Sequence, residues 1–403
     1  MAQGKPIYRD MMISQNRQGA FLLVISLVAG TLGGLLGLLE TGISGGALRA
    51  AHGVLLEFYV ITPAFLGGLG RLLLPSALGR PEARFHPIDW VAVGLLTLGI
   101  GCAVASLCGF APGMAYSLIA WSLSMALLSA NTVIFILENR RTGFADMSCL
   151  AWTELATSAG LITITPVIAM MALKILPASS ASLSLFVGVF ALPLQAIAMS
   201  ATIGMMSSAF FSDDDAPSVP MIILISFIGL AVPVIWLKFF TIGVLQAGNV
   251  ALAWLSVPSI AVIAIFIRQL WRPARHDIAA TIWSIGAMLL LVADGVLQWG
   301  SPTSMVEHAM TLYAAICALF GSFYAWQRAQ SFIVVSPLFG ILHFSTFFSG
   351  VFLSLSPWPA AQSIGHLMMS LCLAFVGVLL LRLVLYTRDG RATSPHIEMS
   401  HRV

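Results

Sequence analysis

The most constraining feature of this sequence is a succession of apolar segments, each close to the length that crosses a lipid bilayer. A membrane-spanning helix needs about 20 predominantly apolar residues, and charged residues make up only 9% of the chain. Twelve such segments follow one another, at residues 21–39, 53–75, 88–108, 114–137, 149–172, 180–209, 219–238, 250–271, 279–299, 305–326, 332–354 and 364–386. We therefore expect an all-α integral membrane protein, with a single twelve-helix transmembrane domain over residues 1–387 and a disordered cytoplasmic tail over residues 388–403.

The positive charges are distributed unevenly between the two sides of the membrane that this arrangement implies. Sixteen of the 19 Lys and Arg residues fall on the side of the N-terminus, and the exceptions are Arg49, Lys174 and Lys238. Because cytoplasmic loops carry an excess of Lys and Arg, we expect a multi-pass protein of a bacterial-type inner (plasma) membrane with both termini in the cytoplasm. The expected partner is membrane lipid, and a net charge of +3 gives no indication of nucleic-acid binding.

The sulfur-containing residues follow no spacing typical of metal ligands. The chain has 18 methionines and five cysteines without a CxxC pair, and buried Met and Cys pack as apolar residues. The cysteines are Cys102, Cys108, Cys149, Cys317 and Cys372. We expect neither a disulfide framework nor a metal site from them.

A pattern of His, Gly and Pro begins at His52. The segment from His52 to Pro87 reads HGVLLEFYVITPAFLGGLGRLLLPSALGRPEARFHP. It resembles the second helix and following loop of subunit I of the haem-copper oxidases, a family of cytochrome c and quinol oxidases. The family pattern is H-G-x-x-M-x-F-F-x-x-x-P-A-x-x-G-G-F-G-N-x-x-x-P, followed by G-x-P-D-x-x-F. The residues in register are His52, Gly53, Phe58, Pro63, Ala64, Gly67, Gly68, Gly70, Pro75, Gly79, Pro81 and Phe85.

Later segments extend the resemblance in the same order. Arg140 and Gly143 occupy the Arg and Gly of the family's N-M-R-x-P-G-M, and Phe240-Thr241-Ile242-Gly243 is similar to its F-T-V-G. Val257-Pro258-Ser259 is similar to V-P-T, and His343-Phe344 begins a match to a late His-Phe motif. The resemblance covers most of residues 20–386 and implies the twelve-helix bundle of subunit I in a shortened form.

The resemblance also implies six histidine ligands for two haems and one copper, and five of them are absent from this chain. The family's G-H-P-E-V-Y is replaced by Gly188–Pro193, and its paired histidines are replaced by Leu237-Lys238. Its H-F-H falls on Tyr313-Ala314-Ala315, and its channel lysine falls on Val262. Since imidazole is the ligand that suits haem iron and copper, we expect no catalytic residue, no metal site and no oxygen reduction by the chain itself.

His52 aligns with the one ligand that remains, and two interpretations are open. It is either an axial ligand of a single low-spin haem, with His308 as the alternative second ligand, or a polar residue that packs and hydrogen-bonds at a helix start. We favour the second interpretation and expect no cofactor, with one haem as the alternative. We expect His343 and His366 to be interior histidines whose ring nitrogens have partners.

Four ionisable residues within the apolar segments are candidate functional residues, because each costs about 2.5–3.5 kcal/mol to insert into a membrane. Glu57 either contributes to a proton or ion path in the vacated haem space or hydrogen-bonds a neighbouring helix. Glu154 is expected at the membrane interface. Asp294 and Lys238 either form an interhelical ion pair or reach to the interface. If Lys238 occupies the former copper site, it needs a buried partner.

Three functions are compatible with these observations. The favoured hypothesis is a catalytically degenerate partner or scaffold subunit of a respiratory terminal oxidase system, associated with other oxidase subunits. The second is a single-haem electron-transfer subunit that uses His52. The third is a membrane protein that conducts protons, ions or a small solute through the emptied pores, using Glu57, Asp294 and Lys238.

Overall fold

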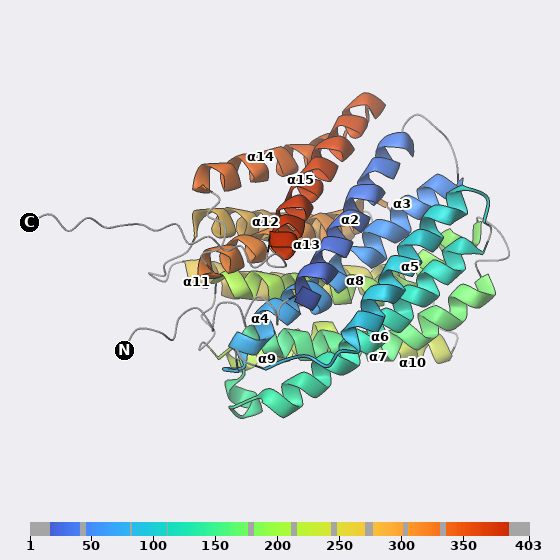
Figure 1. Ribbon diagram of the computed structural model, residues 1–403. Coiled ribbons are helices and arrows are strands. Elements are labelled where there is room, and N and C mark those ends of the chain that lie inside the picture. Colours follow the sequence, from blue (N-terminus) through green and yellow to red (C-terminus); the bar gives the residue numbers. More distant parts are fainter. Residues whose placement is uncertain are drawn as a thin grey trace, which may run out of the picture.

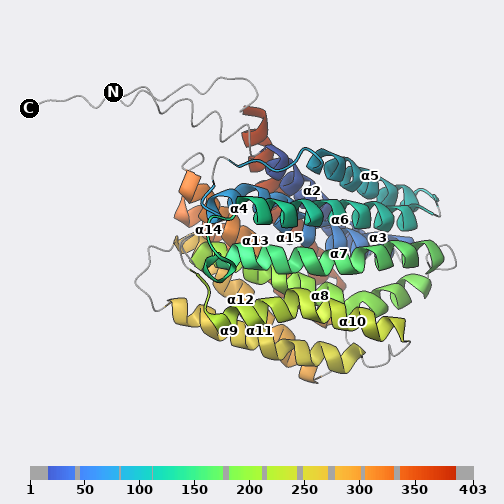
Figure 2. The same cartoon turned by 90° about the horizontal axis from the view of Figure 1, so that it is seen from below.

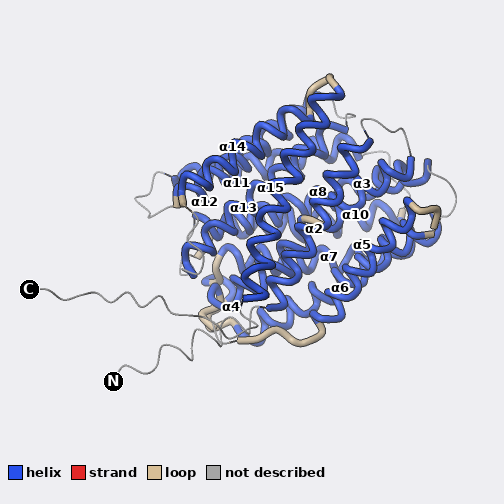
Figure 3. The backbone as a smooth tube through the Cα atoms, turned by 45° about the horizontal axis from the view of Figure 1, so that its top comes forward, coloured by secondary structure: helices blue, strands red, loops and turns tan. Residues whose placement is uncertain are grey.

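The computed structural model describes residues 17–40, 46–80, 83–110, 112–175, 181–210, 216–242, 248–270, 277–300, 305–330 and 336–386, and within these ranges every regular element is a helix (Figures 1 and 3). In chain order the elements are α2 (Arg17–Glu40), α3 (Gly46–Tyr59), η1 (Pro63–Leu69), α4 (Gly70–Ala77), α5 (Asp89–Leu107), α6 (Gly113–Asn139), η2 (Phe144–Asp146), α7 (Cys149–Ile175), α8 (Ala181–Phe210), α9 (Val219–Ser226), η3 (Phe227–Ala231), α10 (Val232–Thr241), α11 (Gly248–Leu270), α12 (Ile278–Gly300), α13 (Met305–Gln330), α14 (Pro337–Ser354) and α15 (Pro359–Tyr386). The predicted tail, residues 388–403, lies outside the described residues.

Each predicted apolar segment coincides with one helix or with a continuous run of helices. Within the described part of the chain, 10 helices are long and apolar enough to cross a membrane, which confirms the all-α membrane class. The other two segments correspond to α11 and α13, and α11 contains a shorter apolar stretch, Val257–Arg268. The count of twelve spans therefore stays a prediction.

The helices form a bundle in which the first and last described helices are neighbours. α2 packs against both α3 and α15, and α15 runs beside α2 in the opposite direction, so α2 begins and α15 ends at the same end of the bundle (Figures 1 and 2). α8 is central, because it contacts α7, α10, α11, α12, α13 and η1. Residues on α8 can therefore meet residues from both halves of the sequence.

Two of the membrane-length helical runs contain a wider, π-helical turn next to a proline. The first is η1, which begins at Pro63, and the second is η3, which is followed by Pro233 in α10. Proline has no backbone N–H to donate to the preceding turn, so the regular hydrogen-bond pattern is interrupted there. All seven residues of η1 are buried. This interruption therefore lies against protein, as irregular backbone at membrane depth requires.

Small residues allow close contact between the helices, as is common in membrane bundles. Gly204 on α8 faces the ring of Phe65 in η1, and a Cβ added at Gly204 would lie 2.5 Å from that ring. Gly160 on α7 packs in the same way against the backbone of η3 at Gly229. The central helices therefore leave little free space between them.

The charge distribution and the even number of predicted spans give a testable topology. Reporter fusions at Arg140, at Arg272 and at the C-terminus should show cytoplasmic activity, and fusions near Gly113, Ser179 and Pro357 should show activity on the outer side. Paired cytoplasmic and exported reporters at each position measure this directly. A C-terminus on the outer side would contradict the twelve-span arrangement.

Candidate functional site

The buried polar residues form two separate groups at different depths of the bundle. The inner network consists of Arg71, Asp89, Asn131 and Thr132, near the end at which α2 and α5 begin. The outer network consists of Gln195, Asp294, Gln298 and Thr311, toward the end at which α12 finishes and α13 begins. Every one of these side chains is at most 5% exposed. An uncompensated polar group in such a position would be strongly unfavourable, so the partners of each one matter.

Arg71 on α4 is the centre of the inner network. Its Nε and Nη2 atoms donate to the two carboxylate oxygens of Asp89, at 2.9 and 3.0 Å. Nη1 donates to the hydroxyl of Thr132 and to the carbonyl oxygen of Leu66, both at 2.6 Å, and Nη2 donates to the carbonyl oxygen of Leu128 at 3.0 Å. All five donors of the guanidinium group are therefore satisfied.

Asn131 and Phe85 make the remaining contacts of the inner network. Asn131 on α6 donates to Asp89 Oδ1 at 2.8 Å and to the carbonyl oxygen of His86 at 3.2 Å. The ring of Phe85 lies 4.3 Å from the centre of the Arg71 guanidinium group. The network joins α4, α5 and α6 through one positive and one negative charge, which is the arrangement that makes a buried pair tolerable.

The inner network is not among the predicted sites, although two of its charged residues lie within consecutive apolar segments of the sequence. Arg71 lies inside the predicted segment 53–75, and Asp89 lies inside the segment 88–108. Arg71 was grouped with the cytoplasmic charges, whereas it is only 3% exposed. Two opposite charges in consecutive predicted spans were the observation that pointed to an interhelical pair.

Glu154 on α7 is fully buried between helices, and the prediction that it lies at the depth of the membrane interface stays a prediction. Neither of its carboxylate oxygens has a hydrogen-bond partner. The side chain lies directly against Gly70, where an added Cβ would be 2.5 Å from Glu154 Oε1. The side chain is buried because α7 packs against α4 near its first turns, which covers a position that the sequence alone leaves exposed.

The outer network joins α8, α12 and α13. Gln195 Nε2 donates to Asp294 Oδ2 at 3.0 Å and to Thr311 Oγ1 at 3.2 Å. Gln298, one turn after Asp294 on α12, donates to the same Oδ2 atom at 2.7 Å. Asp294 is fully buried, so it does not reach to the interface.

A cavity of about 120 Å³ lies beside the outer network, between α3, α8 and α13. Its wall includes Glu57 from α3, Gln195 from α8 and Thr311 from α13. Glu57 is partly buried and has no hydrogen-bond or ion-pair partner among the described residues. The expectation that Glu57 hydrogen-bonds a neighbouring helix is therefore wrong, and the structure instead places it at the cavity.

Lys238 does not occupy an interior site. Its side chain is exposed on α10, in the last turn, and forms no ion pair within the described ranges. The prediction of a buried partner, and with it the alternative of an ion pair with Asp294, is wrong. A lysine near a helix end can extend along apolar surface toward water, which is the alternative that its exposure favours.

The interior histidines contact neighbouring helices. His52 Nδ1 lies 2.7 Å from the carbonyl oxygen of Gly33 on α2, and its ring meets that of His366 on α15 edge-to-face at 5.6 Å. The prediction for His343 is confirmed, because its ring nitrogens lie 2.9 Å from the hydroxyl of Tyr324 and 3.2 Å from the carbonyl oxygen of Cys372. The side chain of His308 lies outside those described.

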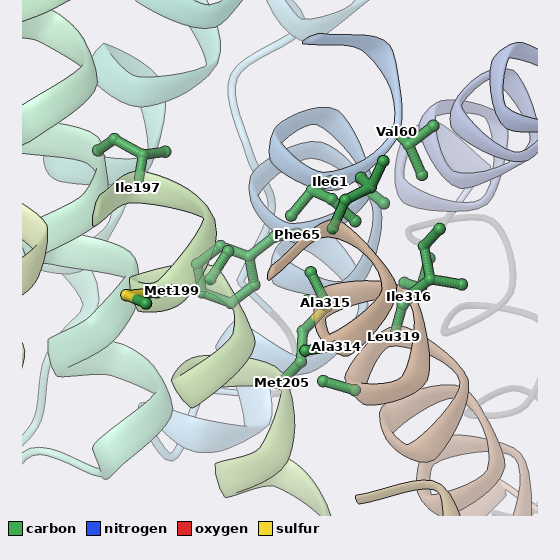
Figure 4. Close-up of a cluster of buried hydrophobic side chains, with 14 of the residues drawn as sticks. Val60, Ile61, Phe65, Ile197, Met199, Met205, Ala314, Ala315, Ile316 and Leu319 are labelled. Carbon is green, nitrogen blue, oxygen red and sulfur yellow. The ribbon is translucent and has the colours of Figure 1, made fainter. Parts of the chain in front are cut away.

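The interior around Tyr313, Ala314 and Ala315 is filled largely by apolar packing. Ala314 and Ala315 are fully buried within a cluster that includes Ile61 and Phe65 from the α3–η1 region and Met205 from α8 (Figure 4). The Tyr313 hydroxyl lies 3.2 Å from Ser354 Oγ. In the part of the chain that the structure describes, no group of three or more His, Cys, Asp or Glu side chains is arranged to hold a metal ion.

The surroundings of His52 do not fit a haem. Its ring faces α2 and α15, where a Cβ added at Gly37 would lie 2.7 Å from His52 Cε1. The cavity beside Glu57 is about 120 Å³, whereas cofactor sites occupy roughly 300–1,000 Å³, and His52 does not line it. The geometry around His52 therefore supports packing and hydrogen bonding.

The inner network predicts an asymmetric response to substitution. Arg71→Met leaves the Asp89 carboxylate buried without its cation, which should lower the free energy of unfolding by about 3–5 kcal/mol. The double variant Arg71→Met/Asp89→Leu should recover much of this loss. The matched control is Arg49→Met, which breaks the exposed Arg49–Glu40 pair and should change stability by at most about 1 kcal/mol. Equal losses for Arg71→Met and Arg49→Met in detergent unfolding curves would contradict the assignment.

Comparison with known proteins gives local similarity. No family model matches the chain. Cytochrome c oxidase subunit 1 of Cereibacter sphaeroides is 40% identical to this chain over 62 residues, which are 15% of this chain and 11% of that protein. The match covers a small part of both sequences. It supports a relationship over that segment, within an all-helical membrane protein, and does not by itself assign an activity.

Proposed function

We propose that this chain is a membrane protein related to cytochrome c oxidase subunit 1 that has lost the oxygen-reducing site and serves as a partner or scaffold subunit of a respiratory terminal oxidase system. The local similarity to that subunit supports the relationship. The observation that carries the loss of activity is the chemistry of the aligned ligand positions, which hold Val189, Leu237, Lys238 and Tyr313.

Oxygen reduction in the haem-copper family requires a haem iron and a copper ion held by imidazole groups. Around the aligned positions of α8 and α10, this chain has an aromatic cluster instead. The ring of Trp236 lies 5.1 Å from the rings of both Phe190 and Phe240, and Trp236 Nε1 donates to the carbonyl oxygen of Val189 at 2.9 Å. Such packing stabilises contact between α8 and α10, and it offers no nitrogen or sulfur atom as a ligand.

The two alternative functions have weaker support. Single-haem electron transfer depends on His52, whose ring faces α2 and α15 in surroundings that do not fit a haem. Conduction across the membrane depends on a polar path, and Met199 and Met205 on α8 and Ala315 on α13, which follow the outer network along their helices, belong to the apolar cluster of Figure 4. A scaffold needs neither a cofactor nor a continuous path.

The proposal predicts two results for the purified full-length chain. Supplied with reduced cytochrome c or with quinol, the protein should show no cyanide-sensitive oxygen consumption, because none of the aligned ligand positions carries an imidazole; Tyr313 could ligate a haem iron but would leave the copper without ligands. An active terminal oxidase in the same detergent is the positive control. Cyanide-sensitive turnover by the chain alone would contradict the loss of the site.

The partner role has a separate readout. An affinity-tagged chain, cross-linked in native membranes and solubilised mildly, should be recovered with subunits of a terminal oxidase identified by mass spectrometry. Recovery of the chain without any oxidase subunit would contradict the scaffold role, whatever the activity assay gives.

A further inference from the structure

The cavity beside α3 contains oxygen atoms that no protein group satisfies. Glu57 lines it and has no partner among the described residues. Gln195 also lines it, is only 4% exposed, and its Oε1 atom has no hydrogen-bond partner. A buried acceptor without a partner is unfavourable, so the Gln195 oxygen, together with the unpaired and partly accessible carboxylate of Glu57, points to a further group at this cavity.

The orientation of the Gln195 amide is fixed by its hydrogen bonds to Asp294 and Thr311. A carboxylate can only accept hydrogen bonds, so the amide group that faces Asp294 is the NH₂ group, which also donates to Thr311. The carbonyl oxygen is thereby left as the atom without a partner. Asp294, which does not line the cavity, thus places a carboxylate next to Gln195, and the unsatisfied acceptor of Gln195 belongs to a residue of the cavity wall.

The polar residues of the cavity wall, which is otherwise apolar, carry oxygen atoms of hard-ligand type. They are the carboxylate of Glu57, the amide carbonyl of Gln195 and the hydroxyl of Thr311. Carboxylate, carbonyl and hydroxyl oxygens suit hard cations, and sulfur or imidazole ligands suit transition metals. Divalent ions such as Ca²⁺ take 6–8 oxygen ligands, usually with several carboxylates, whereas one carboxylate balances a single positive charge.

The size of the cavity fits a hydrated ion. Its volume is about 120 Å³, and one water molecule occupies about 30 Å³ of liquid. A small cation and two or three water molecules can therefore fill it. The helix break at Pro63 follows just after Ile61, another residue of the cavity wall. Interrupted helices at membrane depth commonly border such sites.

Part of the cavity wall lies at the surface of the bundle, and the residues beyond the cavity on the wall helices are apolar. Gly53 on its wall is exposed, and a Cβ added there would meet no other atom within 4 Å. On all three wall helices the residues that follow the cavity are apolar: Phe65 after Ile61, Met199 after Gln195 and Ala315 after Thr311 (Figure 4). The geometry suits a bound ion more than a passing one.

We propose that Glu57, Gln195 and Thr311 form a binding site for a monovalent hard cation of the Na⁺ class, held with water between α3, α8 and α13. This inference does not depend on the oxidase relationship. The bound ion would satisfy the carboxylate of Glu57 and the carbonyl oxygen of Gln195, and it would link α3 to the outer network.

The test is binding of radioactive ²²Na⁺ to the purified full-length protein, with choline replacing other cations in the buffer. The wild-type protein should bind about one Na⁺ per chain in a saturable manner. Glu57→Gln should weaken binding at least tenfold, because it removes the one carboxylate that the described residues place on the cavity wall. Gln195→Leu should also weaken binding. Glu154→Gln is the matched control, since it neutralises another intramembrane acid at the other depth, and it should bind Na⁺ like the wild type.

A second readout covers the case in which Glu57→Gln does not fold. Na⁺ should raise the melting temperature of the wild-type protein relative to equal choline, because a ligand that binds only the folded state stabilises it. The rise should be smaller in Thr311→Val. The proposal is overturned if the wild type shows no saturable Na⁺ binding above the choline background. It is equally overturned if Glu57→Gln folds and binds Na⁺ like the wild type. The same holds if Na⁺ raises the melting temperature of Thr311→Val as much as that of the wild type.

Discussion

Inside a bilayer, charged and polar side chains cannot hydrogen-bond to bulk water and need partners within the protein. This requirement determines how the interior of the bundle is arranged. The Arg71–Asp89 pair is its clearest expression, since the guanidinium group uses all five donors on five acceptor atoms. Such a pair costs desolvation energy and recovers it only through complete pairing. It therefore fixes α4, α5 and α6 in one register, and α7 packs against both α4 and α6.

The central part of the bundle is held together largely by close apolar packing rather than by hydrogen-bonded polar side chains. It contains apolar side chains and small residues. Phe65 fills the space above Gly204, and Ala314 and Ala315 allow α13 to approach the same region. Bulky rings facing glycine and alanine give dense packing of the kind that stabilises membrane helices. Under the proposed relationship to the oxidase subunit, this packing would take the place of metal ligands on α13.

The sequence was sufficient to predict the helices and insufficient to predict which way their polar residues point. Hydropathy places each helix because lipid requires long apolar runs, and the segments matched helices or runs of helices. The faces of those helices depend on neighbours that are far away in sequence. Glu154 is buried because α4 covers it, and Lys238 is exposed because the last turn of α10 faces outward.

The candidate site shows the same division. Glu57 and Asp294 were identified from the sequence because an acid within an apolar run is conspicuous. Gln195, Gln298 and Thr311 were not identified, because neutral polar residues are common in membrane helices and only the tertiary fold brings these three together. The sequence can therefore identify the two acidic residues, Glu57 and Asp294, without identifying the neutral polar residues that lie between and beside them.

The central claim is that side chains occupy the interior of this bundle where the resembled family holds haem. A reduced-minus-oxidised absorbance spectrum of the purified full-length protein tests this most directly, with an oxidase of that family as the positive control. The account predicts no haem bands in the visible region for this chain. A low-spin haem signal that is present in the wild type and lost in His52→Ala, but retained in His343→Ala, would contradict it.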